Sequence, residues 1–339
     1  MKKRHLTLVL VLVLCIQLLC SCGKKEEGSN KIYVGVLCYD QSDTFISELT
    51  DSFRENLESQ NTGATVTIKD AKGSQRDQNE QVKDLIDAGC NVLCVNLVDR
   101  TSPKEIVDMA IENNIPVIFF NREPVAEDMH HWDKLYYVGA RAKESGVIEG
   151  EIVSKIIQED PSADKNNDGK IQYVILEGEP EHQDAIVRTD SSVNIIKNSG
   201  IALEKLGCGI ANWNRGQAHN RMQQIIGQYP TQVELVIANN DDMALGAIDA
   251  YKELNYSADS MPVFVGVDGT KAGLEAIKNG ELAGTAYNDK EGQAAAMASL
   301  TSALVSGKGM DKIHFENGKC IYLPYFMVTK ENVSNYCTE

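Results

Sequence analysis

Polar residues follow most of the apolar segments of this sequence, and Asp and Asn dominate among them. These side chains are short and stiff, and their planar ends accept or donate hydrogen bonds. A ligand covered in hydroxyl groups, each of which donates and accepts, suits this chemistry. The residues at such segment ends are Asp43, Asn96, His182, Asp184, Arg188, Asn240, Asp268 and Asn288, with Tyr39, Asn121 and Arg122 in similar positions.

Two aromatic residues extend this set. Sugars have apolar C–H faces beside their hydroxyl groups, and these faces pack on aromatic rings; Phe45 and Trp213 are the candidates for that role. Helix capping is the alternative interpretation, because Asp and Asn often accept hydrogen bonds from the first N–H groups of the helix that follows. The sequence contains no phosphate-binding glycine loop and no G-x-S-x-G motif, so it offers little support for an enzyme.

A second group of oxygen-bearing residues lies between Asp164 and Gln172, in the segment DKNNDGKIQ. Acidic and amide residues occupy its positions 1, 3, 5 and 9, and Gly its position 6, as at the start of an EF-hand calcium loop. Position 12 departs from that pattern, because Ile175 stands there in place of Glu and a strand-like run follows in place of a helix. From the residues alone, a solvated Asn-Asp-Gly turn is the alternative to a cation loop.

These residues need a framework that brings distant segments together. Short apolar runs alternate with amphipathic stretches along almost the whole chain. Phe45, Leu49, Phe53 and Leu57 are spaced by four and predict a helix, whereas Val92–Val98 is nearly continuous and typical of a parallel strand buried on both faces. This alternation predicts parallel sheets covered by helices, with ligands beyond the carboxyl ends of the strands. About a dozen strands are too many for one ordinary sheet, so we expect two lobes.

The charge balance narrows the possible partners. The 339 residues include 33 Lys and Arg against 49 Asp and Glu, a formal net charge of −16. Nucleic acids and anionic membrane surfaces are bound through clusters of basic residues, so this balance argues against both. The six cysteines that follow position 22 match no zinc-ligand spacing.

The N-terminus predicts export. Met1–Arg4 is basic, and Leu6–Leu19 is apolar but short for a membrane span. Leu19-Cys20-Ser21-Cys22 resembles a bacterial lipobox, with an ordinary secretory signal as the alternative. The resemblance implies a lipoprotein signal peptide over residues 1–22, lipidation of Cys22 and a polar tether over residues 23–30. The protein is then exported and held to the outer face of the bacterial cell membrane, its only membrane contact being the lipid anchor.

Several motifs resemble one known family over nearly all of residues 31–330. Among them are Asn96-Leu-Val-Asp99, Pro116–Pro124 (PVIFFNREP), Tyr136-Tyr-Val-Gly139, Val236–Asp241 (VIANND) and Gly266-Val-Asp268. With these motifs the chain resembles the periplasmic-binding-protein-like sugar receptors of ABC transporters, and among them the galactose/glucose-binding receptors. The resemblance implies a type I periplasmic binding protein fold. This is an α/β fold with two doubly wound parallel-sheet lobes joined by three hinge strands.

The expected lobe boundaries follow from this resemblance. The N-terminal lobe comprises residues 31–118 plus 289–321, and the C-terminal lobe residues 119–288 plus 322–339. The chain is expected to cross between lobes near residues 118, 289 and 322. Tyr322–Val328 is predicted as the last strand.

Carried over position by position, the resemblance implies a sugar site in the cleft between the lobes. Phe45 and Trp213 would sandwich the ring, and the hydrogen-bonding residues would be Asp43, Asn96, His182, Asp184, Arg188, Asn240, Asp268 and Asn288. Arg188 lies one helical turn after Asp184 and is expected to neutralise that carboxylate while donating to the sugar. The family has Pro between the His and the Asp, where this chain has Gln183.

The resemblance also implies a structural Ca²⁺ ion. The family's calcium loop has nine residues, and a distant Glu completes the set of ligands. In this sequence the implied ligands are Asp164, Asn166, Asp168, the backbone carbonyl of Lys170, Gln172 and Glu234.

The implied function is non-enzymatic. A monomer would capture D-galactose or D-glucose outside the cell and deliver it to the transmembrane subunits of an ABC permease, and a chemoreceptor is a further implied partner. One alternative is the same fold with another sugar, such as a pentose or a furanose signal. A secreted glycosidase that uses two aspartates is another, although the chain shows no barrel or sandwich pattern.

Overall fold

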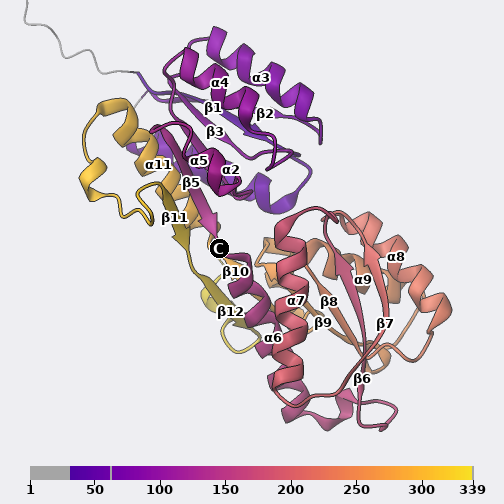
Figure 1. The fold of residues 1–339 in the computed structure, drawn as a ribbon. Helices are drawn as coiled ribbons and strands as arrows, with labels where there is room; N and C mark the ends of the chain where they lie inside the picture. Colours follow the sequence, from indigo (N-terminus) through magenta and orange to yellow (C-terminus); the bar gives the residue numbers. More distant parts are fainter. Residues whose placement is uncertain (1–30, 62, 338–339) are drawn as a thin grey trace, which may run out of the picture.

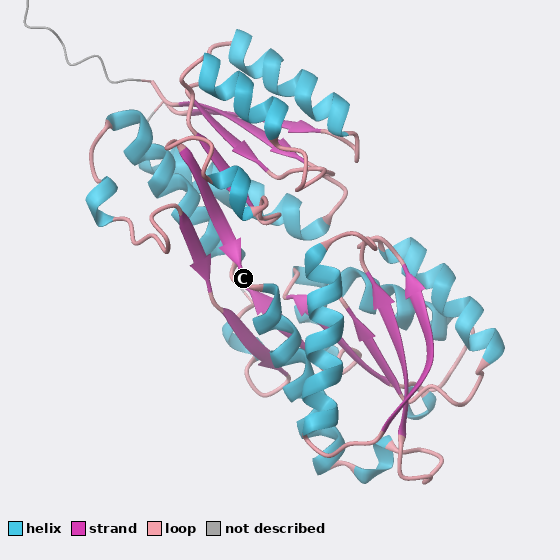
Figure 2. Cartoon of the chain, viewed as in Figure 1, coloured by secondary structure: helices cyan, strands magenta, loops and turns pink. Residues whose placement is uncertain are grey.

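The computed structural model describes residues 31–61 and 63–337, which form two lobes (Figure 1). Each lobe contains a six-stranded sheet with helices packed against it (Figure 2). The predicted α/β class with two lobes is therefore confirmed. Among the described residues, no helix is both long enough and apolar enough to span a membrane.

The first lobe has the strand order β11-β5-β4-β3-β1-β2, and all of its strand pairs are parallel. Its strands are β1 (Tyr33–Cys38), β2 (Thr65–Asp70), β3 (Val92–Val95), β4 (Val117–Phe120), β5 (Leu135–Ala140) and β11 (Cys320–Leu323). Its helices are α2 (Thr44–Gln60), α3 (Gln75–Asp87), α4 (Lys104–Glu112), α5 (Ala126–Met129) and α11 (Lys290–Ser306).

The second lobe has the strand order β12-β10-β9-β8-β6-β7, in which only β12 runs antiparallel to its neighbour. Its strands are β6 (Ile171–Glu177), β7 (Leu203–Ile210), β8 (Leu235–Ala238), β9 (Val263–Asp268), β10 (Gly284–Asn288) and β12 (Tyr325–Thr329). Its helices are α6 (Ala142–Glu159), α7 (Gln183–Asn198), α8 (Arg215–Gln228), α9 (Asp241–Glu253) and α10 (Lys271–Asn279). Short 3₁₀ turns lie at Pro161–Ala163, Ala258–Ser260, Met310–Lys312 and Val333–Asn335.

The first chain crossing corrects the prediction. We expected it near residue 118, but β4 and β5 are both paired within the first sheet, so the chain leaves that lobe after Ala140. The reason is that β5 is a buried strand between β4 and β11, which extends the first sheet beyond the predicted boundary. The segment 119–140 thus belongs to the first lobe.

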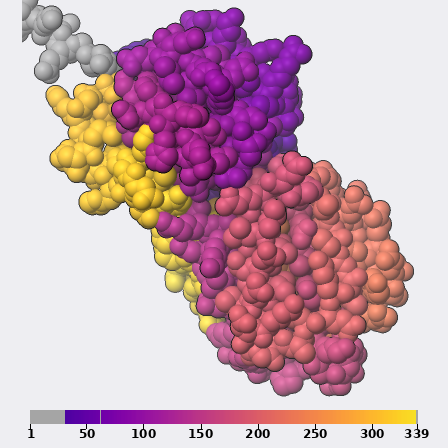
Figure 3. Space-filling model, viewed as in Figure 1, coloured from indigo at the N-terminus to yellow at the C-terminus, as the bar shows by residue number. Residues whose placement is uncertain are grey.

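The other two crossings lie beside this one. The chain returns between β10 and α11, at Asp289, and passes again to the second lobe at Pro324. The predicted single strand Tyr322–Val328 is therefore two strands in different sheets. Proline has no N–H to donate to a strand ladder, which favours the break at this position. In the space-filling view the yellow C-terminal segment lies along the first lobe and continues beside the second (Figure 3).

The core explains why the sheets were predictable. All four residues of β3 are buried, as expected for a parallel strand covered on both faces. The predicted stripe on α2 is also buried, since Phe45, Leu49, Phe53 and Leu57 are each at most 4% exposed. At about 25 cal/mol per Å² of apolar area removed from water, burial of such stripes holds each helix on its sheet.

Candidate functional site

A small polar cavity of about 30 Å³ lies between the lobes, at the carboxyl ends of their strands. A cavity of this size has room for only a few water molecules, so the side chains from the two lobes lie close together. The cavity is lined by Tyr39, Asp43, Phe45, Asn121, Arg122, His182, Asp184, Arg188, Trp213, Asn240 and Asp268.

Eight of the ten predicted sugar-site residues line this cavity, and they come from both lobes. Asp43 and Phe45 stand at the start of α2 in the first lobe, and the second lobe contributes His182, Asp184, Arg188, Trp213, Asn240 and Asp268. The remaining two lie outside the lining. Asn96 is fully buried behind it and donates to the Phe120 carbonyl and the Asn121 side chain, at 3.2 and 3.1 Å. Asn288 is buried too and accepts from Gln293 at 2.6 Å.

Three cavity residues were not among the predicted ones. Tyr39, Asn121 and Arg122 follow β1 and β4, so their place at strand ends was the available signal. The Arg122 guanidinium lies 3.5 Å from the centre of the Tyr39 ring and donates to the Val98 carbonyl at 2.9 Å. It also pairs with Glu179 at 3.1 Å. Because Glu179 follows β6, this ion pair joins the two lobes.

Helix capping and cavity lining turn out to be compatible roles. The Asp43 carboxylate accepts from Ile46 N at 3.1 Å and caps α2. His182 and Asn240 cap α7 and α9 in the same way. All three nevertheless line the cavity, because helices that follow parallel strands begin at the edge of the sheet where the ligand sites of such folds lie.

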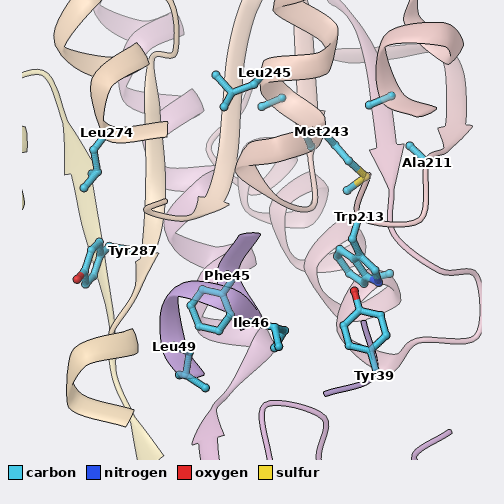
Figure 4. Packing of buried hydrophobic residues seen from close by; sticks show 14 of the residues in the cluster. Tyr39, Phe45, Ile46, Leu49, Ala211, Trp213, Met243, Leu245, Leu274 and Tyr287 are labelled. Atoms are coloured by element: carbon cyan, nitrogen blue, oxygen red, sulfur yellow. The ribbon is translucent and has the colours of Figure 1, made fainter. Parts of the chain in front are cut away.

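The aromatic residues are fixed by their surroundings. Asn212 and Trp213 both have left-handed backbone conformations, with φ of 48° and 61°, which turn the indole toward the cavity. Gly178 lies against this ring, and a Cβ there would lie 2.2 Å from it. The His182 ring packs edge-on against the indole with 5.2 Å between centres. Phe45 and Trp213 come from different lobes, and Tyr39 lies beside the indole (Figure 4).

Burial dominates the ionisation of the cavity carboxyls. It raises the pKa of Asp43, although hydrogen bonds from Tyr39 at 2.6 Å and Ile46 oppose this. It also raises the pKa of Asp184, against the opposing charge of Arg188 at 3.8 Å. A carboxylate held in this way is a strong acceptor for hydroxyl groups, since charge-assisted hydrogen bonds exceed neutral ones.

Arg188 is the cation that the second lobe contributes to the cavity, beside Arg122 from the first, and His182 is neutral. Burial opposes the charge on Arg188, but Tyr325, Asp268 and Asp184 outweigh burial and raise its pKa. The pKa of His182 lies well below 6.5, first because of burial and then because of the nearby arginines. Its Nδ1 accepts from Asp184 N at 3.1 Å, so the neutral ring carries its proton on Nε2 and is a donor there.

The second predicted group of residues also comes together. The Asp168 N–H lies 3.2 Å from Asp164 Oδ1 and 2.8 Å from Asn166 Oδ1. Gln172 donates to Asp168 at 2.9 Å. Glu234, only 2% exposed, accepts from the backbone N–H of Lys165 and of Gln172, at 2.6 and 3.0 Å, and so ties both ends of the loop to β8.

This loop offers oxygen atoms rather than nitrogen or sulfur, which is the donor set of a hard cation. Its six predicted ligands combine three carboxylates with amide and backbone oxygens. The Lys170 side chain pairs with Glu204 at 3.1 Å, so only its backbone is available to the loop. In the described part of the chain, no group of three or more His, Cys, Asp or Glu side chains is gathered closely enough to hold a metal by itself.

A family model described as "Periplasmic binding protein domain" matches residues 34–309. The chain is 35% identical, over 89% of its length and 91% of the relative, to the D-galactose/methyl-galactoside binding periplasmic protein MglB of Haemophilus influenzae. It is 29% identical to a putative rhizopine-binding protein of Rhizobium meliloti, over 81% of this chain and 82% of the relative.

Solved structures share the fold. One is a solute binding protein of an ABC transporter from Bacillus halodurans, solved with myo-inositol, which superposes with a TM-score of 0.75 at 29% identity. The match covers 91% of this chain and 98% of that protein. A counterpart from Actinobacillus succinogenes with D-allose has a TM-score of 0.77 at 20% identity, covering 90% and 100% of the two chains. These relatives are named as binding proteins, in agreement with the predicted absence of enzymatic activity.

Proposed function

This chain belongs to the periplasmic binding protein family, and we propose that it captures a monosaccharide outside the cell and delivers it to an ABC sugar permease. One observation carries the proposal. The cavity between the lobes is lined by carboxyl groups, two amides, a neutral histidine and two guanidinium groups, with aromatic rings from both lobes. This combination matches the hydroxyl groups and the C–H faces of a sugar.

We propose D-galactose or D-glucose as the ligand. The 35% identity to a protein named for D-galactose and methyl-galactoside supports this choice, as do the eight predicted residues in the cavity. Other relatives are named for xylitol and ribose, at 27% identity each. A pentose or a polyol is therefore the second candidate.

The cavity of about 30 Å³ is far smaller than a hexose, so the lobes must part before a sugar enters. Opening would break the Arg122–Glu179 ion pair and the 2.6 Å hydrogen bond from Thr44 to Asp242, both of which join the lobes. Because ligand contacts come from both lobes, a bound sugar would favour the closed form. The permease subunits, and a chemoreceptor where one is present, would recognise that form.

A sugar titration of the protein from Gly23 onward, which lacks the cysteine predicted to be lipidated, tests the proposal. Galactose, glucose, ribose, xylose and myo-inositol are added in turn, and binding is followed by intrinsic fluorescence and by calorimetry. Trp213 lines the cavity, whereas Trp132 lies in the first lobe outside it. We expect a saturable signal with a hexose that Trp213→Phe removes and Trp132→Phe keeps. Binding of ribose, xylose or myo-inositol alone would favour the second candidate, and no binding at all would contradict a sugar receptor.

We further propose that the loop Asp164–Gln172, with Glu234, holds a structural Ca²⁺ ion. Bound there, the ion would supply positive charge between the loop and β8 and so hold the two together. The oxygen-rich side chains of the loop, their hydrogen bonds to the Asp168 N–H and the burial of Glu234 support this assignment.

Thermal unfolding tests the calcium site. The melting temperature is expected to rise with added CaCl₂ and to fall with a chelator in the wild-type protein. Glu234→Gln should lose most of this response, whereas Glu204→Gln, which removes only the partner of the Lys170 side chain, should keep it. An identical melting temperature in calcium and in chelator would exclude the site.

We also propose that Cys22 carries the lipid anchor. This residue lies outside the described residues, so the lipobox resemblance alone supports the assignment. Metabolic labelling with a fatty acid should label the full-length protein, and Cys22→Ser should abolish the label. Labelling that persists in Cys22→Ser would contradict it.

A further inference from the structure

The loop that carries Asp268 into the cavity has an unusual backbone. Asp268 is the last residue of β9 and has a φ of 114°, whereas the other described non-Gly residues with positive φ lie between 48° and 61°. L-residues rarely adopt such a conformation, and it persists only where surrounding contacts enforce it. Asp268 is 5% exposed and lines the cavity, so this conformation places a carboxyl group where a ligand would be.

The contacts that hold the backbone in this conformation involve a second carboxylate, that of Asp241. This residue is the first of α9 and is fully buried. It accepts from the Thr270 N–H at 2.9 Å and from the Thr285 hydroxyl at 2.7 Å. The Thr285 hydroxyl in turn accepts from the Gly269 N–H at 3.3 Å. Asp241 therefore holds the two residues that follow Asp268, one directly and one through Thr285.

The sequence leaves space for this carboxylate. A Cβ at Gly266 would lie 2.6 Å from Asp241 Oδ1, and a Cβ at Gly273 would lie 2.2 Å from Oδ2. Any other residue at either position would displace the carboxylate. Lys290 secures the same loop from its other side by donating to the Gly269 carbonyl at 3.0 Å.

Burial of a carboxyl group is costly, and Asp241 shows this. Burial raises its pKa to about 7, although the hydrogen bonds from Thr285 and Thr270 lower it. A helix cap does not require this residue, because Asn240 already caps α9 by accepting from Met243 N at 3.0 Å. The contacts of Asp241 all lead to the loop after Asp268.

From these contacts we infer that Asp241 is a positioning residue: through Thr285 and Thr270 it holds Asp268 in a strained backbone conformation that directs its carboxylate into the cavity. The inference rests on the proposed function, since it assigns Asp241 a part in sugar affinity. It adds a residue that does not line the cavity.

The first experiment uses the Thr285 hydroxyl, whose removal leaves every charge in place. Thr285→Val removes the link between Asp241 and the Gly269 N–H, and sugar affinity is expected to fall about tenfold, because a buried donor loses its partner. Thr285→Ser keeps the hydroxyl and should restore most of the affinity. Thr301→Val is the matched control, as Thr301 is equally buried but lies on α11 in the first lobe, whereas Thr285 and Asp241 lie in the second lobe. Unchanged affinity in Thr285→Val, or equal losses in Thr285→Val and Thr285→Ser, would overturn the inference.

The second experiment tests the strain without a ligand. Asp268→Gly and Asp268→Ala both lack the carboxylate, and glycine usually makes a protein less stable than alanine. At a φ of 114° the order should reverse, so Asp268→Gly is expected to melt at the higher temperature. A higher melting temperature for Asp268→Ala would overturn the strain argument. This comparison keeps its meaning if the wild-type protein binds none of the sugars, an outcome that contradicts the proposed function.

Discussion

Replacing Glu149 by Gln is expected to stabilise this protein at neutral and alkaline pH. Glu149 lies on α6 and is fully buried. Neither of its carboxyl oxygens has a partner at ordinary hydrogen-bond geometry among the described residues, and the Ser192 hydroxyl is the hydrogen-bonding group that acts on this carboxyl. Its neighbours on the helix are Gly146 and Gly150, where a Cβ would lie 2.7 Å from the Arg188 carbonyl and 2.8 Å from the Ser192 carbonyl. The backbones of α6 and α7 thus meet around this carboxyl and exclude water from it.

The magnitude follows from the shifted ionisation. Burial raises the pKa of Glu149 from 4.5 to about 8, and the charge of Arg188 and the Ser192 hydroxyl offset this only in part. The unfolded chain therefore loses the proton above about pH 4.5, whereas the folded protein keeps it to about pH 8. In that interval the folded state binds one more proton, so the free energy of unfolding falls by about 1.4 kcal/mol per pH unit. At pH 7 the accumulated loss is about 3 kcal/mol.

Glutamine has the shape of the protonated side chain and does not titrate. Unfolding by heat and by urea at pH 5, 6.5 and 8 should show a stability advantage of Glu149→Gln that is small at pH 5 and grows with pH. Glu151→Gln changes an exposed residue of the same helix and serves as the control, which should run parallel to the wild type. An advantage independent of pH, or one that shrinks as pH rises, would refute the reasoning.

Three further predictions concern the cavity. Gly178→Ala should displace the Trp213 ring, shift its emission and weaken sugar binding about tenfold, since the ring packing is lost; an unchanged spectrum and affinity would contradict the contact. Glu179→Gln breaks the ion pair with Arg122 that joins the lobes but changes no residue that lines the cavity, so it should speed sugar release in stopped-flow fluorescence; an unchanged release rate would argue against a part for this ion pair in closure. The pKa of His182 is lowered well below 6.5 in the folded protein. Below about pH 6.5 the unfolded chain therefore binds a proton at this residue that the folded protein does not bind, and the free energy of unfolding decreases as the pH falls. His182→Asn should reduce that loss in melts at pH 5 and 7, and an equal loss in both proteins would rule the histidine out as its source.

The buried strands and the amphipathic helices could be predicted because burial itself imposes their pattern. The run around Val92–Val95 and the stripe on α2 illustrate this. β7 was missed for the opposite reason, since it is an edge strand whose residues are mostly exposed or only partly buried. β5 was not predicted as a strand, because the motif Tyr136-Tyr-Val-Gly139 within it was used only for the family resemblance. Its pairing with β11 joins segments far apart in the sequence, and no local pattern reports such a pairing.

The site shows a similar division. The polar residues at strand ends predicted most of the cavity residues, because the carboxyl ends of parallel strands lie at one edge of a sheet. The same signal included Tyr39, Asn121 and Arg122, but it could not rank them. Their place in the cavity depends on contacts between the lobes and on stacking of Arg122 over Tyr39. Asn96 follows β3 and Asn288 is the last residue of β10, yet hydrogen bonds to Asn121 and Gln293 turn both away from the lining.

The roles of cap and ligand residue are coupled by the architecture. In a doubly wound sheet each helix begins just beyond a strand end, so its free N–H groups and the ligand meet at the same edge. Asp43 shows the result, since its Oδ1 accepts from Ile46 N while its Oδ2 accepts from the Tyr39 hydroxyl beside the cavity. Asn240 accepts from Met243 N with its oxygen and donates to the Trp213 carbonyl with its nitrogen. A capping side chain is thereby held in one orientation before any ligand arrives, which reduces the entropy lost on binding. The capping interpretation of these Asp and Asn residues thus explains how a polar cavity between two lobes is preorganised.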